Sequence, residues 1–184
     1  QIPQGIQPRD AMGFMTIPIL RILERSGVIG LNDEIEQTLD ALRKDHSAQG
    51  EVVAKKLIGK IPMIYSSQDM YCIARIWKIK INENAKVQAF WNTFPEVNHN
   101  EMVGFTNPRG DYYFIFIKDL EDDRQIRKRM NVMKTLLESK GYPVLMIHLG
   151  GKSRLARLFS AILLGSFVGY HLALIGGTDP TPVK

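Results

Sequence analysis

The sequence predicts an α/β fold, in which a doubly wound parallel sheet forms the middle of a three-layer α/β/α domain behind an N-terminal helical arm. Two observations lead to this prediction. After residue 60, short β-rich runs alternate with segments of helical length. Before residue 60, apolar residues recur only at helical spacing. We therefore divide the chain into a linker and helical segment, residues 1–58, and an α/β domain, residues 59–184.

The helical arm is predicted to contain three helices. The first carries apolar residues at helical spacing, is expected to kink or divide at Pro18 and ends near Gly27 and Gly30. Asn32 and Asp33 cap a second helix that runs to about residue 44, and a third covers residues 51–58. We interpret the apolar face of the first helix as part of the core, with a surface for a partner subunit as the alternative; its residues are Met12, Phe14, Met15 and Ile19.

The α/β part is predicted to contain strands at residues 61–65, 87–91, 112–117 and 144–148. Helices are expected at residues 69–84, 95–103, 122–139 and 152–174. Strand, helix and strand in turn form right-handed βαβ units, which give a parallel sheet. Because ligands of such sheets collect beyond the carboxyl ends of the strands, we expect the site there.

Composition narrows the class of protein. The chain has 184 residues, of which 45% are hydrophobic and 23% charged, as in one ordinary globular domain. Its single cysteine, Cys72, excludes a disulfide framework and a cysteine-based metal site. No leader opens the sequence, and Gly165 and Gly169 interrupt the most apolar late segment. We therefore expect a cytoplasmic protein that does not enter a membrane.

The net charge of +5 favours acidic partners, which include phosphate esters and nucleic acids. A run of basic residues follows the acidic run Glu121-Asp122-Asp123; its members are Arg124, Arg127, Lys128, Arg129 and Lys134. Acid at the start of a helix and base later is typical of a solvated helix. Since no recognition motif accompanies the basic run, we predict no nucleic-acid partner.

Two polar stretches interrupt the apolar pattern: Asn82-Glu83-Asn84 and Asn98-His99-Asn100-Glu101. We expect Glu83 and His99 to project into one crevice at the carboxyl edge of the sheet. A carboxylate and an imidazole together suit proton transfer next to a carbonyl group. From these residue types alone, the simpler interpretation is favoured: Glu83 is a solvated acid at a helix end, and His99 is a hydrogen-bonded, partly buried histidine.

A family resemblance reverses that preference. Asn-Glu-Asn-x-Lys at residues 82–86, followed by Pro-Glu-x-Asn-His-Asn-Glu-x-Val-Gly at residues 95–104, closely resembles the second sugar isomerase (SIS) domain of bifunctional phosphoglucose/phosphomannose isomerases. The resemblance continues at residues 61–65, 74–78 and 177–183. Gln7-Pro8-Arg9 is similar to the segment that links the two SIS domains of the family. Residues 59–184 are thus expected to form the C-terminal SIS-type domain, and the N-terminal SIS domain to be absent from this chain.

The resemblance implies aldose–ketose isomerisation of glucose 6-phosphate and mannose 6-phosphate to fructose 6-phosphate through an enediolate. It implies no metal and no organic cofactor, a hexose 6-phosphate as ligand and a homodimer as the assembly. Glu83 would move a proton between C1 and C2, His99 would assist ring opening, Arg9 would stabilise the enediolate and Thr181 would bind substrate. The family's lysine after the Asp-Pro-Thr-Pro motif is expected beyond the end of the chain, so Lys184 is not assigned.

Two alternatives stay open. The first is a noncatalytic SIS module that senses sugar phosphate, and the second is a ketol isomerase or deaminase of amino sugars. Phosphate in this family is bound by Ser/Thr-rich loops of the absent domain, which Ser66-Ser67 only faintly resembles. Serines in such a position more often cap a helix.

Overall fold

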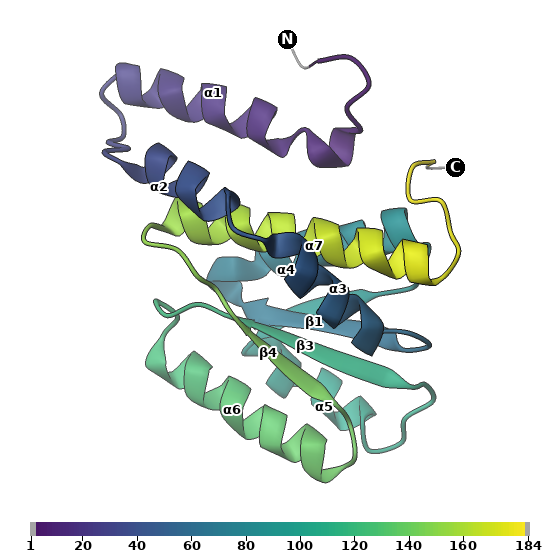
Figure 1. Ribbon diagram of the computed structural model, residues 1–184. Coiled ribbons are helices and arrows are strands. Elements are labelled where there is room, and N and C mark those ends of the chain that lie inside the picture. Colours follow the sequence, from purple (N-terminus) through teal and green to yellow (C-terminus); the bar gives the residue numbers. More distant parts are fainter. Residues whose placement is uncertain (1–2, 183–184) are drawn as a thin grey trace.

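A computed structural model describes residues 3–182 and contains a sheet of four parallel strands (Figure 1). The strands are β1 (Ile61–Ser67), β2 (Phe90–Phe94), β3 (Tyr112–Lys118) and β4 (Val144–His148). Their order in the sheet is β2-β1-β3-β4, so β1 and β3 lie in the middle. All three pairings are parallel. The predicted α/β class with a parallel sheet is confirmed.

Helices cover both faces of this sheet (Figure 1). On one face lie α4 (Tyr71–Lys80), which continues into a π-helical turn (Ile81–Ala85), and α7 (Arg154–Ile175); α2 (Glu34–Leu42) and α3 (His46–Lys56) pack against α7. On the other face lie α5 (Glu101–Gly104) and α6 (Arg124–Ser139). Helix α1 (Met12–Arg25) stands away from the sheet, and short 3₁₀ turns occupy Pro8–Asp10, Gln68–Met70 and Glu96–Asn98.

The two-residue period of the strands fills two separate cores. Ile64 and Ile115 point to the α4 and α7 side, where they pack with Trp77 and Leu164. Tyr65 points to the other side, together with Met63, Phe114 and Phe116. These strand residues pack with Met130 of α6 and with Val97, just before α5. Both faces of the strands are therefore apolar, as burial between two helical layers requires.

Several predicted boundaries change. Strand β2 begins at Phe90 rather than at residue 87, because Lys86 adopts a left-handed conformation (φ 58°) that ends the preceding helix and turns the chain. The predicted helix over residues 95–103 is two short pieces instead of one. Pro18 lies inside α1 without dividing it. Helix α3 starts at His46, earlier than expected, because the Asp45 side chain accepts hydrogen bonds from the backbone N–H groups of Ser47 and Ala48.

Helix α7 is long and apolar enough, by length and composition alone, to cross a bilayer. In this fold it is the central helix of one face and contacts α2, α3 and α4. Residues within the domain bury 44% of its most apolar window. Its apolar character is explained by this central position in the core.

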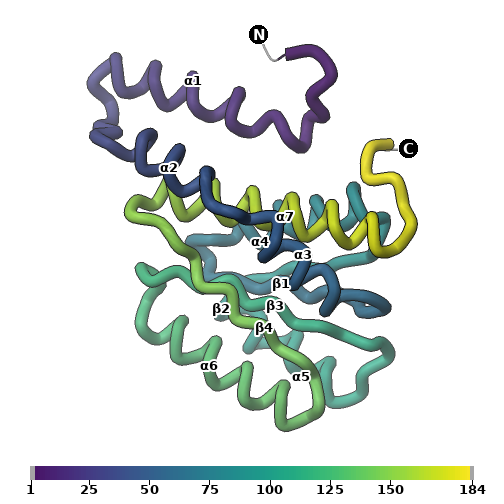
Figure 2. The backbone as a smooth tube through the Cα atoms, viewed as in Figure 1, coloured from purple at the N-terminus to yellow at the C-terminus, as the bar shows by residue number. Residues whose placement is uncertain are grey.

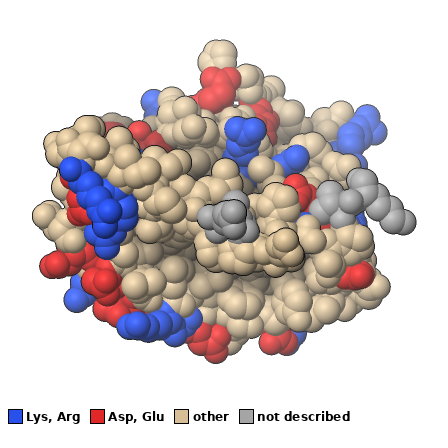
Figure 3. All heavy atoms as spheres, turned by 90° about the horizontal axis from the view of Figure 1, so that it is seen from above, with Lys and Arg blue, Asp and Glu red and all other residues tan. Residues whose placement is uncertain are grey.

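Helix α1 contains no buried residue, so the prediction that its apolar face belongs to the core is wrong. Phe14, Met15 and Ile19 are exposed. Most of the surface seen from the α1 side is uncharged (Figure 3). Between α1 and the helices below it lies an apolar groove of about 700 Å³. The opening and closing segments of the chain meet beside this groove, as the path of the backbone shows (Figure 2).

Candidate functional site

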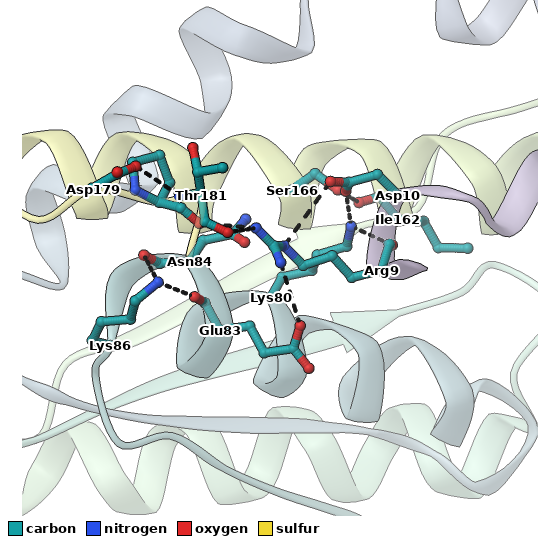
Figure 4. A network of polar contacts seen from close by, with 11 residues as sticks. Arg9, Asp10, Lys80, Glu83, Asn84, Lys86, Ile162, Ser166, Asp179 and Thr181 are labelled. Atoms are coloured by element: carbon teal, nitrogen blue, oxygen red, sulfur yellow. Dashed lines mark hydrogen bonds and ion pairs between the residues drawn. The ribbon is translucent and has the colours of Figure 1, made fainter. Parts of the chain in front are cut away.

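Three of the four predicted site residues meet at one place. Arg9 comes from the first 3₁₀ turn, Glu83 from the π turn after α4, and Thr181 from the closing segment (Figure 4). The Arg9 side chain is 7% exposed, and its Nη1 lies 3.8 Å from Oε2 of Glu83. Its Nη2 donates hydrogen bonds to the carbonyl oxygens of Pro180 (2.9 Å) and Thr181 (3.1 Å). Arg9 therefore joins segments that are about 170 residues apart in the sequence.

The π turn sets the position of Glu83. One extra residue per turn is a departure from the α-helix that is frequent at functional sites. The Lys86 ammonium group donates hydrogen bonds to the carbonyl oxygens of Glu83 and Asn84, so it closes the end of this turn. Helix α7 can approach because Gly169 has no side chain: a Cβ atom there would lie 2.7 Å from the carbonyl oxygen of Lys80. The turn is thus held against α7.

A cavity of about 360 Å³ opens beside Arg9. Two buried polar atoms on its lining residues, Arg9 Nε and Asn84 Oδ1, have no hydrogen-bond partner within residues 3–182. The other lining residues are Gln7, Asp10, Leu163, Ser166, Phe167, Tyr170, Pro180 and Thr181.

Thr181 contributes mainly through its backbone. Its carbonyl oxygen accepts from Arg9, and its N–H donates to Oδ1 of Asp179 at 2.8 Å. This bond to the charged form lowers the pKa of Asp179. The closing segment is therefore tied both to itself and to Arg9. Lys184, which the sequence left unassigned, lies outside the described residues.

Sequence reasoning missed Lys80 and Asp10. The Lys80 side chain is 2% exposed, and its Nζ donates to the carbonyl oxygen of Arg9 at 2.6 Å and to the Asp10 carboxylate. A signal was present, because Lys80 follows Trp77 by three residues and precedes Asn84 by four, on the buried stripe of its helix. A lysine on such a stripe needs a charged partner.

The site does not lie where the sequence placed it. Helix α4 starts after the carboxyl end of β1 and runs back along the sheet, so Glu83 lies at the amino edge, just before β2. The expectation of a crevice at the carboxyl edge is therefore wrong for Glu83. In a βαβ unit the end of the connecting helix always returns to the amino edge.

His99 lies apart from this cluster. It follows the carboxyl end of β2, in the segment whose neighbours Val97 and Met102 pack against the opposite face of the sheet from α4. Its side chain is 82% exposed, and its Nδ1 lies 4.0 Å from Oε1 of Glu96. One copy of the chain therefore does not bring His99 to Glu83, contrary to the expectation of a shared crevice.

The carboxyl edge instead holds a buried ion pair. Nε of Arg157, on α7, lies 3.0 Å from Oδ1 of Asp119, which follows β3. Burial raises the pKa of the nearby Asp122. Ser66 and Ser67 are buried beside this edge, so their hydroxyl groups do not form an open phosphate loop. Within residues 3–182, no group of three or more His, Cys, Asp or Glu side chains could hold a metal ion.

Comparisons with known proteins agree with this architecture. The bifunctional phosphoglucose/phosphomannose isomerase of Caldicellulosiruptor bescii is 39% identical over the whole chain. A D-glucosamine-6-phosphate 4-epimerase of Sulfolobus acidocaldarius is 33% identical over 115 residues, which are 61% of this chain and 37% of that protein. A glucose-6-phosphate isomerase-like protein of Thermus thermophilus shares the fold, with a TM-score of 0.66 at 17% identity, over 97% of this chain and 59% of that structure.

The chain spans only 58% of the length of the C. bescii relative, so it corresponds to part of that protein. A family model described as the bacterial phospho-glucose isomerase C-terminal SIS domain matches residues 46–184. This match covers the sheet, Glu83 and Thr181, and it agrees with the motifs at residues 82–86 and 95–104. The chain therefore belongs to the family of bacterial phospho-glucose isomerase C-terminal SIS domains.

Proposed function

We propose that the protein containing this chain isomerises glucose 6-phosphate and mannose 6-phosphate to fructose 6-phosphate. The observation that carries the proposal is the Glu83 carboxylate 3.8 Å from the buried Arg9 guanidinium, and Arg9 in turn lines a cavity of about 360 Å³. The names of the full-length relatives, bifunctional phosphoglucose/phosphomannose isomerases, support the same chemistry. The cytoplasmic location stays a prediction.

In the proposed reaction, Glu83 removes the proton from C2 of the open-chain aldose, and the electron pair moves to form a cis-enediolate with its negative charge on the C1 oxygen. A proton then moves from the C2 hydroxyl to the C1 oxygen, and the protonated Glu83 returns its proton to C1 as the C2 carbonyl forms, which gives the ketose. Arg9 stabilises the developing oxyanion, because a guanidinium stays charged and interacts more strongly with the enediolate than with the neutral carbonyl. Thr181 binds substrate at the same cavity.

His99 is proposed to assist ring opening. It lies on the other face of the sheet from Glu83. It therefore acts on the same substrate only if it is supplied by a second copy of the chain. This topology supports the proposed homodimer, in which each site combines Glu83 of one subunit with His99 of another.

The test is Glu83→Gln in the full-length protein. We expect kcat to fall by about 1,000-fold while hexose-phosphate binding and thermal stability stay close to wild type, because the amide keeps the shape of the side chain but cannot accept the proton. The matched control is Glu36→Gln on the exposed side of α2, which should keep full activity. Activity of Glu83→Gln within about tenfold of wild type would contradict the assignment of Glu83 as the base.

A second candidate is chemistry on amino-sugar phosphates, which the identity to the glucosamine-6-phosphate epimerase favours. Turnover of glucosamine 6-phosphate by the full-length protein, compared with turnover of glucose 6-phosphate, distinguishes this candidate from the first proposal. A noncatalytic sensing module would instead bind hexose phosphate without turnover, even in the full-length protein.

A further inference from the structure

Lys80 is a buried cation whose side-chain hydrogen bonds both go to the turn that carries Arg9. Only 2% of its side chain is exposed, and its Nζ bonds both the Arg9 carbonyl oxygen and Oδ1 of Asp10. Removing an ammonium group from water is unfavourable unless the group is well paired. A lysine in this place thus needs both of its acceptors, and both belong to the turn that carries Arg9.

Arg9 has two carboxylates within reach. Oδ2 of Asp10 lies 4.0 Å from its Nε, and Oε2 of Glu83 lies 3.8 Å from its Nη1. A free carboxylate next to a guanidinium tends to form a bidentate pair that occupies two N–H groups. Lys80 binds the other oxygen of Asp10 and so holds this carboxylate away from such a pair (Figure 4).

We propose that Lys80 is a positioning residue for Arg9, an inference that rests on the proposed function. Its ammonium group fixes the Arg9 backbone through the carbonyl oxygen and keeps the Asp10 carboxylate from pairing with Arg9. The guanidinium therefore faces the cavity and Glu83. A donor fixed before the reaction needs no reorganisation when the oxyanion forms. Lys80 itself touches neither substrate nor the reacting atoms.

The test compares two ligands in the full-length protein. A sugar-phosphate hydroxamate mimics the enediolate and its negative charge, whereas a hexitol 6-phosphate carries no charge near C1 and C2. Lys80→Gln should weaken hydroxamate binding by about 20-fold and hexitol phosphate binding by less than about threefold, with kcat falling in parallel and KM nearly unchanged. Adding Asp10→Asn should restore most of the loss, because no free carboxylate then competes for Arg9.

Lys78→Gln, on the same helix, is the control and should leave both affinities unchanged. Equal weakening of both ligands by Lys80→Gln would show a merely structural role and overturn the proposal. If Lys80→Gln does not fold, the double variant with Asp10→Asn, which buries no unpaired charge, is measured. Hydroxamate affinity within about fivefold of wild type then supports the proposal, and a loss as large as that of Arg9→Gln overturns it.

Assays of the wild-type protein separate a failure of the proposed function from a failure of the proposed role of Lys80. If it converts no hexose 6-phosphate, the proposed function fails. If it does and Lys80→Gln behaves like wild type, only the role of Lys80 fails.

Discussion

Arg9 and Glu83 attract each other without forming a direct hydrogen bond. The 3.8 Å between Nη1 and Oε2 exceeds the 2.7–3.2 Å range of an N–H···O bond. The Glu83 side chain is 37% exposed, so part of it faces solvent. Its oxygens thus keep free positions to accept a proton, while Arg9 keeps N–H groups for an oxyanion. This arrangement suits the two separate roles that we propose.

His99→Ala is predicted to affect cyclic substrate more than open-chain substrate. Ring opening needs a proton transfer to the ring oxygen, and the later carbon proton transfer does not use this group. We expect a loss of about 10-fold or more in kcat/KM with the cyclic sugar and less than about threefold with an open-chain analogue. Steady-state kinetics of the full-length protein measure both.

The control for His99 is His148→Ala, an exposed histidine at the end of β4, which should change neither value. Equal losses of His99→Ala on the two substrates would contradict the ring-opening role.

At the scale of elements, glycines decide how closely α7 meets its neighbours. A Cβ atom at Gly165 would lie 2.7 Å from Trp77, and one at Gly50 of α3 would lie 2.6 Å from Cβ of Phe167. Both distances are below those that a Cβ atom tolerates, so the neighbouring helix packs directly against the backbone of each glycine. The close approach of α7 also positions the end of α4 and therefore Glu83.

The division of the chain between residues 58 and 59 stays a prediction.

Gly50→Ala is predicted to destabilise the fold by about 1–3 kcal/mol, because the added methyl group forces α3 and α7 apart in a well-packed core. Urea unfolding, followed by circular dichroism, measures the change in the free energy of unfolding. Gly30→Ala is the matched control, since a Cβ atom there meets nothing within 4 Å. An unchanged midpoint for Gly50→Ala would show that the two helices can shift without cost.

At the scale of the whole molecule, the chain covers 58% of the C. bescii relative, and its buried Ser66-Ser67 pair offers no open phosphate loop. The phosphate of the proposed hexose 6-phosphate substrate is its strongest binding group, with nearly two charges and several acceptor oxygens. A chain that does not bind this phosphate does not hold C1 and C2 against Glu83, and the effective concentration of reacting groups then falls by orders of magnitude.

We therefore predict that the chain alone folds but shows no appreciable isomerase activity. A coupled assay for fructose 6-phosphate on the purified chain measures this, and the Glu83→Gln chain corrects for contaminating host isomerase. Robust turnover that Glu83→Gln abolishes would prove the prediction wrong. It would mean that this chain builds a phosphate site of its own.

The sequence by itself determined the fold class, the order of strands and helices, and the motifs that indicate the family. These features depend on local periods of two and 3.6 residues and on short runs of residue types, which can be read along the chain. Residue types drew attention to Glu83 and His99, and the family resemblance implied roles for Arg9, Glu83, His99 and Thr181. The local periods also placed β3 and β4 within one residue of their observed bounds.

Only the tertiary structure decided which of these candidates meet. Arg9 contacts Thr181, which lies about 170 residues later in the sequence. Lys80, at the end of α4, is covered by the first turn, which carries Arg9. His99 and Glu83 are only 16 residues apart, but they lie at opposite edges of the sheet because β2 runs between them, and their segments pack on opposite faces. Helical or strand periodicity fixes the side of an element that is buried, whereas the packing of distant segments fixes what that side contacts.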